Sequence, residues 1–176
     1  MLDTRQIAPP PRIDLPQLLH ATTARLFRLA EELSRRTDLW QHHVRFAQDS
    51  RFTVRIAVTS NYEAWLLTWL LGQSTGLHDH GGSAGAFIVL KGVINEMVVA
   101  DAETPSAALT LVHRNLTSGR PRAFGESYLH DVGNIGQVPA VSLHVYAPVL
   151  ETMRRFAVDG SGRLQVVSHE RSGTDW

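Results

Sequence analysis

The feature that most constrains the fold of this chain is a succession of short β-rich segments, which begins at Phe52 and continues almost to the C-terminus. Gly, Pro, Asn and Asp separate the segments, and these residues are typical of turns. The expected strands cover residues 52–58, 63–71, 86–90, 93–99, 107–114, 139–146 and 163–169. Their number and spacing predict a mainly β sandwich or barrel.

The residues before this region predict helix instead. Apolar side chains recur at helical spacing between Gln17 and Arg36, and a shorter helical segment is expected at 39–46. Residues 1–16 contain three consecutive prolines and are expected to form an extended tail. The 176 residues fit one domain, so we expect a tail over 1–16 and a single domain over 17–176 with a helical N-terminal part at 17–48.

Composition excludes several function classes. The formal net charge is zero and the basic residues are scattered, which argues against nucleic acid or an anionic membrane surface as a partner. No signal peptide or bilayer-spanning segment is expected, so the predicted location is the cytoplasm. The chain has no cysteine, which leaves histidine and carboxylate as transition-metal ligands. A small molecule is therefore the expected partner.

The segment His78-Asp79-His80 lies at the end of a long apolar run and precedes the small residues at 81–85. In an extended segment the side chains of residues i and i+2 point to the same face, so both imidazoles can bind one ion while Asp79 points away. The pattern predicts half of a metal site.

The layout around the pair resembles the first motif of the cupin superfamily, with Gly72 ahead of the histidines and Gly92 in the following turn. Such a jelly roll places both imidazoles on an inner face. Most metal-binding cupins have a Glu shortly after the second His, but Ala84 and Gly85 stand there and neither can bind a metal. His130, followed by Asn134, resembles the second motif and would supply a third imidazole.

A later strand candidate carries Ser142, His144 and Tyr146 at alternate positions, so a hydroxyl, an imidazole and a phenol share one face. In a barrel interior these groups must bond to one another or to a ligand. The alternative is that this face meets water and that the residues between them, Val141, Leu143 and Val145, are buried.

Together these residues resemble the cysteine dioxygenase type I family, and most closely its bacterial thiol dioxygenases, over about residues 52–148. The resemblance implies an iron(II) cofactor bound by His78, His80 and His130. It also implies a small thiol and O2 as partners, and a catalytic relay from Ser142 through His144 to Tyr146. The expected reaction adds both oxygen atoms to the sulfur of L-cysteine and gives cysteine sulfinate.

The resemblance further implies that one residue binds the substrate carboxylate. This residue is an Arg in members that use cysteine and a Gln in members that prefer 3-mercaptopropionate. Arg55 falls at about that place, with Arg51 as the alternative, and Trp69 is also implicated at the substrate site. In animal members a Cys crosslinks to the Tyr. Gly85 stands at the matching position, so Tyr146 is expected to act as an ordinary phenol.

Other interpretations stay open at this point. The substrate could be 3-mercaptopropionate or another small thiol acid, and three histidines could also hold zinc for a hydrolase or lyase. A metal-binding cupin without catalysis is a further alternative, and either a monomer or a small homo-oligomer is compatible with the sequence. The remaining histidines are expected to be surface or structural residues.

Overall fold

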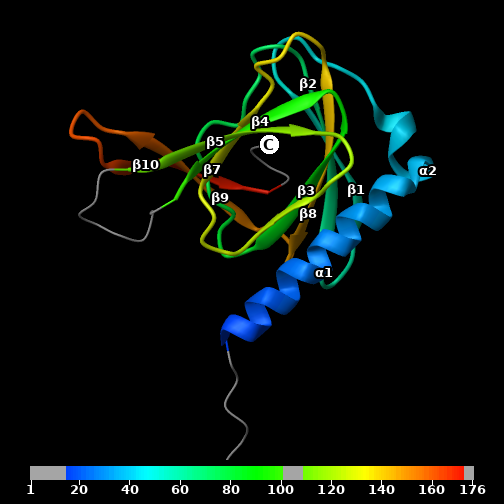
Figure 1. The fold of residues 1–176 in the computed structure, drawn as a ribbon, viewed down its shortest axis with the longest axis horizontal. Coiled ribbons are helices and arrows are strands. Elements are labelled where there is room, and N and C mark those ends of the chain that lie inside the picture. Colours follow the sequence, from blue (N-terminus) through cyan, green and yellow to red (C-terminus); the bar gives the residue numbers. More distant parts are fainter. Residues whose placement is uncertain (1–14, 101–108, 173–176) are drawn as a thin grey trace, which may run out of the picture.

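A computed structural model describes residues 15–100 and 109–172, and the expected Pro-rich tail lies almost entirely outside them. Helix α1 precedes the β region, and ten strands follow (Figure 1). The elements are α1 (Leu15–Arg35), α2 (Thr37–Trp40), a 3-10 turn (Gln41–His43), β1 (Phe52–Val58), β2 (Glu63–Trp69), β3 (Ala84–Lys91), β4 (Val93–Val99), β5 (Leu111–Thr117), β6 (Arg122–Phe124), β7 (His130–Gly133), β8 (Ala140–Ala147), β9 (Thr152–Val158) and β10 (Leu164–Arg171).

The first layer is a five-stranded sheet in the order β1-β2-β8-β3-β6. Strand β8 pairs antiparallel with both β2 and β3, and it therefore occupies the centre of the sheet. Every residue of β2, and all of β8 except the last, is buried. A strand buried on both faces must be covered by other elements on each side of its sheet.

The second layer consists of the three-stranded sheet β5-β4-β7 and the hairpin β9-β10. The segment around His78 lies between them. Its backbone exchanges hydrogen bonds with His130 of β7 at 2.9 and 3.1 Å, and Phe156 of β9 donates to the carbonyl of Leu77 at 2.9 Å. This segment thus joins the two parts of the second layer.

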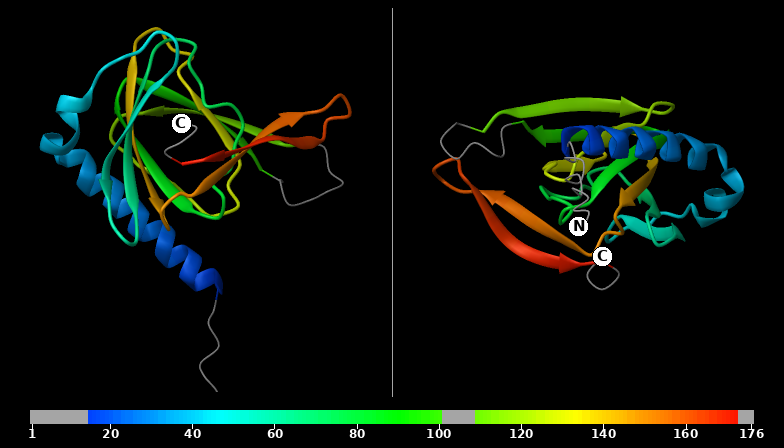
Figure 2. Two further views of the ribbon diagram at one scale, coloured as in Figure 1. Left: turned by 180° about the vertical axis from the view of Figure 1, so that it is seen from behind. Right: turned by 90° about the horizontal axis from the view of Figure 1, so that it is seen from below.

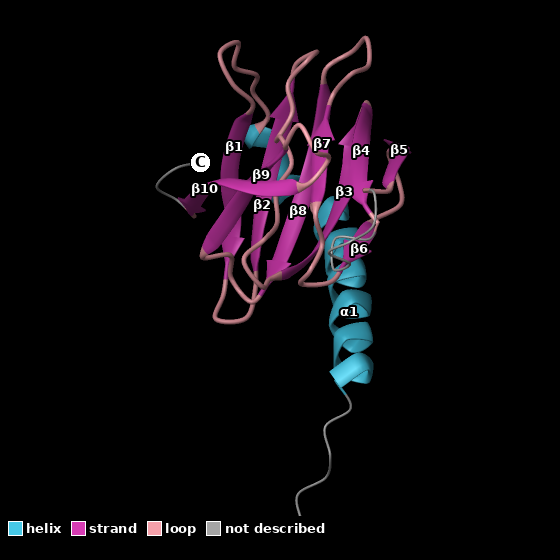
Figure 3. Ribbon diagram, turned by 90° about the vertical axis from the view of Figure 1, so that its left-hand side faces the viewer, coloured by secondary structure: helices cyan, strands magenta, loops and turns pink. Residues whose placement is uncertain are grey.

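Two clusters of apolar side chains fill the structure on either side of the first sheet. One lies between the layers and contains Trp65, Phe87, Val132, Leu150 and Met153 among others. The other lies where α1 packs on β3 and β8, through Leu26, Ala30 and Leu33 against residues such as Ile88, Leu143 and Val145. Figures 2 and 3 show α1 on one side of the strands and the β9-β10 hairpin on the other.

The mainly β jelly-roll prediction is confirmed, and the observed strands β1 and β4 have the predicted bounds. The short strands β6 and β7 and the strand β9 were not predicted. The strand expected at 107–114 starts in undescribed residues, and β5 is observed at Leu111–Thr117. None of the described helices is long and apolar enough to cross a membrane.

Candidate active site

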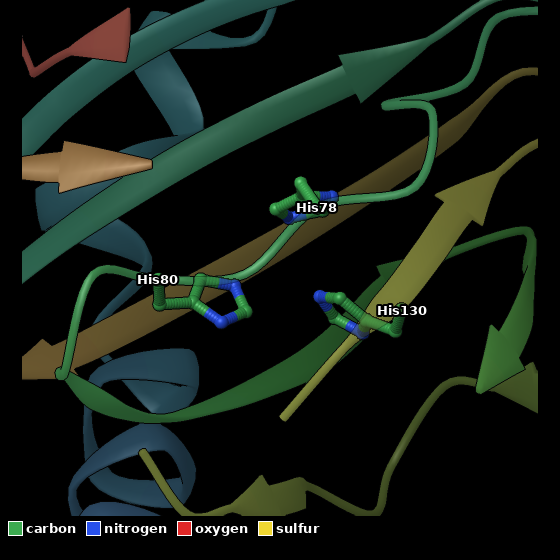
Figure 4. A group of neighbouring side chains, drawn as sticks. All are labelled: His78, His80 and His130. Carbon is green, nitrogen blue, oxygen red and sulfur yellow. The ribbon is translucent and has the colours of Figure 1, made fainter. Parts of the chain in front are cut away.

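The three predicted histidines meet between the two layers. His78 and His80 come from the segment between β2 and β3, which pairs with both β7 and β9, and His130 is the first residue of β7. Each offers one ring nitrogen, and these three atoms all lie within 4.8 Å of one another. The rings converge on a common point (Figure 4), and all three side chains are buried. Asp79 points away and binds Arg154 instead, as the alternation along an extended segment predicts.

Two of the three imidazoles have their orientation fixed by a hydrogen bond at Nδ1. His78 Nδ1 lies 2.9 Å from the carbonyl oxygen of Gly76, and His130 Nδ1 lies 3.0 Å from Oε1 of Glu96. Because a carbonyl and a carboxylate accept hydrogen bonds, both Nδ1 atoms carry the proton and both Nε2 atoms keep a free lone pair. This is the tautomer that a metal site needs.

His80 gives the strongest indication of a metal-binding role. Both of its ring nitrogens are buried, and neither has a hydrogen-bond partner among the described residues. A buried polar atom without a partner costs free energy. A bond from His80 to a metal ion would remove that cost, so the residues present fit a metal.

The neutral state of the histidines also favours metal binding. Burial, followed by the charges of the neighbouring histidines, holds the pKa values of His78 and His80 well below their ordinary value. The neutral imidazole is the form that binds a metal. Ala84 and Gly85, neither of which can bind a metal, are the first two residues of β3.

Sequence reasoning missed Glu96, the carboxylate closest to the histidines that the structure reveals. It lies on β4 with its side chain fully buried, and the pKa of Glu96 is below its ordinary value. Burial opposes that shift, but hydrogen bonds from His130 and Tyr128 and the charge of Arg122 outweigh it. The sequence did contain an indication of its burial. Glu96 alternates along β4 with the apolar residues Ile94 and Val98, and these three positions are buried.

The predicted face of β8 forms a chain of hydrogen bonds. Ser142 Oγ lies 2.8 Å from His144 Nε2, and Tyr146 Oη lies 3.4 Å from His144 Nδ1. All three side chains are buried, so the alternative in which they face water is wrong. Helix α1 explains why, because it covers the opposite face of β8 and buries Leu143 and Val145 there.

Trp69 extends this chain rather than facing the cavity. The indole is fully buried and its Nε1 donates to Ser142 Oγ at 2.9 Å. An indole N–H can only donate, so Ser142 accepts from Trp69 and its own proton is directed to Nε2 of His144. Nδ1 of His144 then carries the proton that faces Tyr146 Oη, and the phenol is left free to donate elsewhere.

Two pKa shifts keep the hydrogen-bonded side chains of β8 in one protonation state. Burial lowers the pKa of His144 to about 3, and the charges of His130 and Arg51 add to the effect. Burial also raises the pKa of Tyr146 well above its ordinary value. At neutral pH the imidazole is therefore neutral and the phenol keeps its proton.

The His144 shift predicts a pH-dependent stability. In the unfolded chain His144 binds a proton near its ordinary pKa of 6.5, whereas in the folded protein it does so at about 3. The unfolded state thus binds more protons at this residue between these values, and the contribution of His144 to the free energy of unfolding must fall as the pH drops below 6.5, by up to about 1.4 kcal/mol per pH unit. Urea unfolding of the metal-free protein at pH 5, 6 and 7 measures this slope.

The matched variant is His144→Gln. Its free energy of unfolding should depend less steeply on pH, because about one proton fewer is taken up on unfolding. His78 and His80 titrate in both proteins, so the difference between the slopes reports His144 alone. Equal slopes would contradict the buried neutral imidazole.

Gly85 faces the site at a point with no room for a side chain. A Cβ built there would lie 2.6 Å from Cε2 of Phe124 and 3.0 Å from Cδ1 of Tyr146. The Phe124 ring in turn stacks on His80, with centroids 4.8 Å apart. Phe124 therefore occupies the space into which a residue 85 side chain would extend.

We expect Gly85→Ala to lower the free energy of unfolding by about 1–3 kcal/mol because the Phe124 ring must shift. Gly160→Ala is the control, since a Cβ at Gly160 has nothing within 4 Å and the backbone there needs no left-handed conformation. Urea midpoints compare the two variants. Equal stabilities would show that Phe124 moves at no cost.

A cavity lies beside the histidines and is lined by two members of the relay, His144 and Tyr146. The other lining residues are His78, His130, Arg51, Thr53, Trp65, Leu67, Thr75, Val132 and Met153. The Tyr146 phenol and the metal-binding face thus border the same space.

The expectation that Arg55 faces this cavity is not met. Its side chain is 44 % exposed and its Nη1 lies 3.3 Å from Oε2 of Glu63. Glu63 is fully buried, so it attracts the nearest cation. The alternative residue, Arg51, lines the cavity, and it forms no ion pair with any carboxylate in the part of the chain that the structure describes. Burial, followed by the charge of Arg155, lowers the pKa of Arg51.

The fold and the site define a cupin-type protein with a three-histidine candidate metal centre. Solved structures with the same fold include the TT1209 protein from Thermus thermophilus (TM-score 0.53, 21 % identity, 62 % of this chain and 93 % of that one). Another is a protein with a double-stranded β-helix domain from Klebsiella pneumoniae (TM-score 0.52, 15 % identity, 73 % of this chain and 93 % of that one).

The family model for cysteine dioxygenase type I matches residues 17–159, and the chain belongs to this family. Curated relatives named cysteine dioxygenase type 1, from Homo sapiens and Bos taurus, are 30 % identical over 122 residues. The match covers 66 % of this chain and 60 % of each relative.

Proposed function

We propose that this protein is an iron(II)-dependent thiol dioxygenase that converts L-cysteine to cysteine sulfinate. The observation that carries the proposal is the unpartnered His80 imidazole, which converges with His78 and His130 beside a cavity that the Tyr146 phenol also lines. Family membership supports the same reaction class. 3-Mercaptopropionate or another small thiol acid is the alternative substrate.

The proposed reaction adds both atoms of O2 to one sulfur. The thiol sulfur is oxidised by four electrons and O2 is reduced by the same four, so no external reductant is needed. Iron(II), held by His78, His80 and His130, would supply the one-electron chemistry that lets O2 react with a thiolate. The protein supplies position and electrostatics.

The relay gives Tyr146 a defined role. The donor-only indole of Trp69 sets the direction of the hydrogen bonds through Ser142 and His144, so the Tyr146 hydroxyl proton is free to point into the cavity. A phenol with a raised pKa holds that proton at neutral pH. Tyr146 is thus suited to donate a hydrogen bond to the substrate or to oxygen atoms being transferred.

Arg51 is suited to bind the substrate carboxylate. Its Nε is buried without a hydrogen-bond partner among the described residues, and its guanidinium carbon lies 5.9 Å from the centroid of the Trp69 ring. A guanidinium can bind a carboxylate through two parallel hydrogen bonds, which fixes orientation as well as charge. Three neutral imidazoles around a divalent ion also favour an anionic substrate.

We expect Arg51→Ala to lower kcat/KM for L-cysteine about 10- to 100-fold, the loss expected for hydrogen bonds to a charged group. Arg55→Ala, whose side chain pairs with Glu63, should change it little. Steady-state kinetics with cysteamine, which lacks the carboxylate, provide the control. An equal loss with cysteamine, or a larger loss in Arg55→Ala, would contradict the assignment of Arg51.

Oxygen uptake tests the proposed function directly. The protein is loaded with iron(II) without oxygen, L-cysteine and 3-mercaptopropionate are compared at equal concentration, and products are identified by mass. Faster sulfinate formation from cysteine supports the proposal, and preference for 3-mercaptopropionate keeps the chemistry while changing the substrate. No uptake with either thiol at full iron occupancy would favour a zinc hydrolase or a binding protein.

A further inference from the structure

The carboxylate of Glu96 is the centre of a buried network behind His130. Oε1 lies 3.0 Å from Nδ1 of His130 and accepts a hydrogen bond from the Tyr128 hydroxyl at 2.9 Å. Oε2 accepts from Nε of Arg122 at 3.2 Å, and Nη2 of Arg122 donates to the Tyr128 hydroxyl at 2.9 Å. Nη1 of Arg114, on the neighbouring strand β5, lies 3.7 Å from Oε2 of Glu96. Each oxygen of Glu96 is therefore held in place.

This network determines how the His130 ring is presented. The Nδ1 proton binds Glu96, so Nε2 has the free lone pair and the ring cannot rotate without breaking a buried, charge-assisted bond. The Tyr128 ring restrains the same imidazole edge-on, with centroids 5.0 Å apart at 64°. His130 is thus held by a hydrogen bond to Glu96 and by a ring contact with Tyr128.

The network also reaches His80, the imidazole without a hydrogen bond of its own. Tyr128 stacks on Phe124 with centroids 4.7 Å apart, and Phe124 stacks on His80 at 4.8 Å. Tyr128 consequently contacts the supports of two of the three candidate ligands. An ordinary buried ion pair that serves stability alone would not need this placement.

We propose that Glu96, held by Tyr128 and Arg122, is the positioning residue that orients His130 for metal binding. The inference rests on the proposed metal site and goes beyond it, because it assigns metal affinity to residues that do not touch the metal. It also places a carboxylate behind a ligand set that itself has none.

The test compares Glu96→Gln with Glu63→Gln. Both carboxylates are fully buried and paired with an arginine, but the hydrogen-bond partners of Glu63 are Arg55 and the Leu150 backbone rather than a histidine. Cobalt(II) is titrated into each metal-free protein against a competing chelator, and the electronic spectrum of bound cobalt is recorded. Folding is checked by circular dichroism and by urea unfolding.

We expect Glu96→Gln to bind cobalt about 10- to 100-fold more weakly than wild type and to alter the cobalt spectrum, as the loss of an outer partner of a ligand does. Glu63→Gln should match wild type in both. Tyr128→Phe keeps the ring and loses one donor to Glu96, so it should weaken binding about five-fold. Tyr128→Phe also decides the matter if Glu96→Gln does not fold.

Unchanged affinity and spectrum in Glu96→Gln, or equal losses in the Glu96 and Glu63 variants, would overturn this inference while leaving the metal site intact. A wild-type protein that binds no cobalt would overturn the metal site, and the inference with it.

Discussion

His130→Ala is expected to lose the metal, with an affinity for iron(II) or cobalt(II) reduced more than about 100-fold, beyond the usual effect of an outer partner. The substitution removes one of three ligands and leaves the buried Glu96 carboxylate without its imidazole donor. Metal content after anaerobic loading and desalting gives the first measurement, and cobalt titration gives the affinity.

The control for this variant is His113→Ala, because His113 lies exposed on β5 and is absent from the histidine cluster. It should keep full metal content. A His130→Ala protein that is folded and retains as much metal as His113→Ala would contradict the assignment of His130 as a ligand.

Tyr146→Phe is expected to keep the metal and to lose most turnover, about 100-fold or more in kcat, the usual contribution of a positioned proton donor. The ring remains in its packed place beside His80, at a centroid distance of 5.2 Å, while the hydroxyl that ends the relay is removed. Metal content and sulfinate production are measured on the same preparation.

Tyr62→Phe is the matched control, since Tyr62 packs against the cluster beneath α1 and does not line the cavity. Normal turnover in both variants would exclude the Tyr146 phenol from the reaction. Loss of metal in Tyr146→Phe would instead assign it a structural role at the site.

The His78 and His80 pair could be predicted from the sequence because alternation in an extended segment places both side chains on one face. Alternation also predicted the shared face of Ser142, His144 and Tyr146. The third histidine, His130, and the relay itself were predicted from the resemblance to the family. What alternation left open was which face of β8 is inside, and α1 settles that point by covering Leu143 and Val145.

The arginine that faces the cavity could not be predicted in this way. Arg51 and Arg55 have the same parity, so periodicity assigns them to one side of an extended segment. The difference between them comes from Glu63, a buried carboxylate on the adjacent strand that binds Arg55 and leaves Arg51 beside the cavity. Glu96 was missed because a single charged residue on a strand has no partner that the sequence identifies.

The segment between β2 and β3, which pairs with both β7 and β9, has a consequence for the lifetime of the protein. His78 pairs with both His130 and Arg155, so the site closes only when distant parts of the chain have come together, and such contacts form slowly. A metal that binds the native state alone stabilises it by mass action, by about 2.7 kcal/mol at a hundred-fold excess over Kd. Metal supply would then affect how long each chain escapes proteolysis.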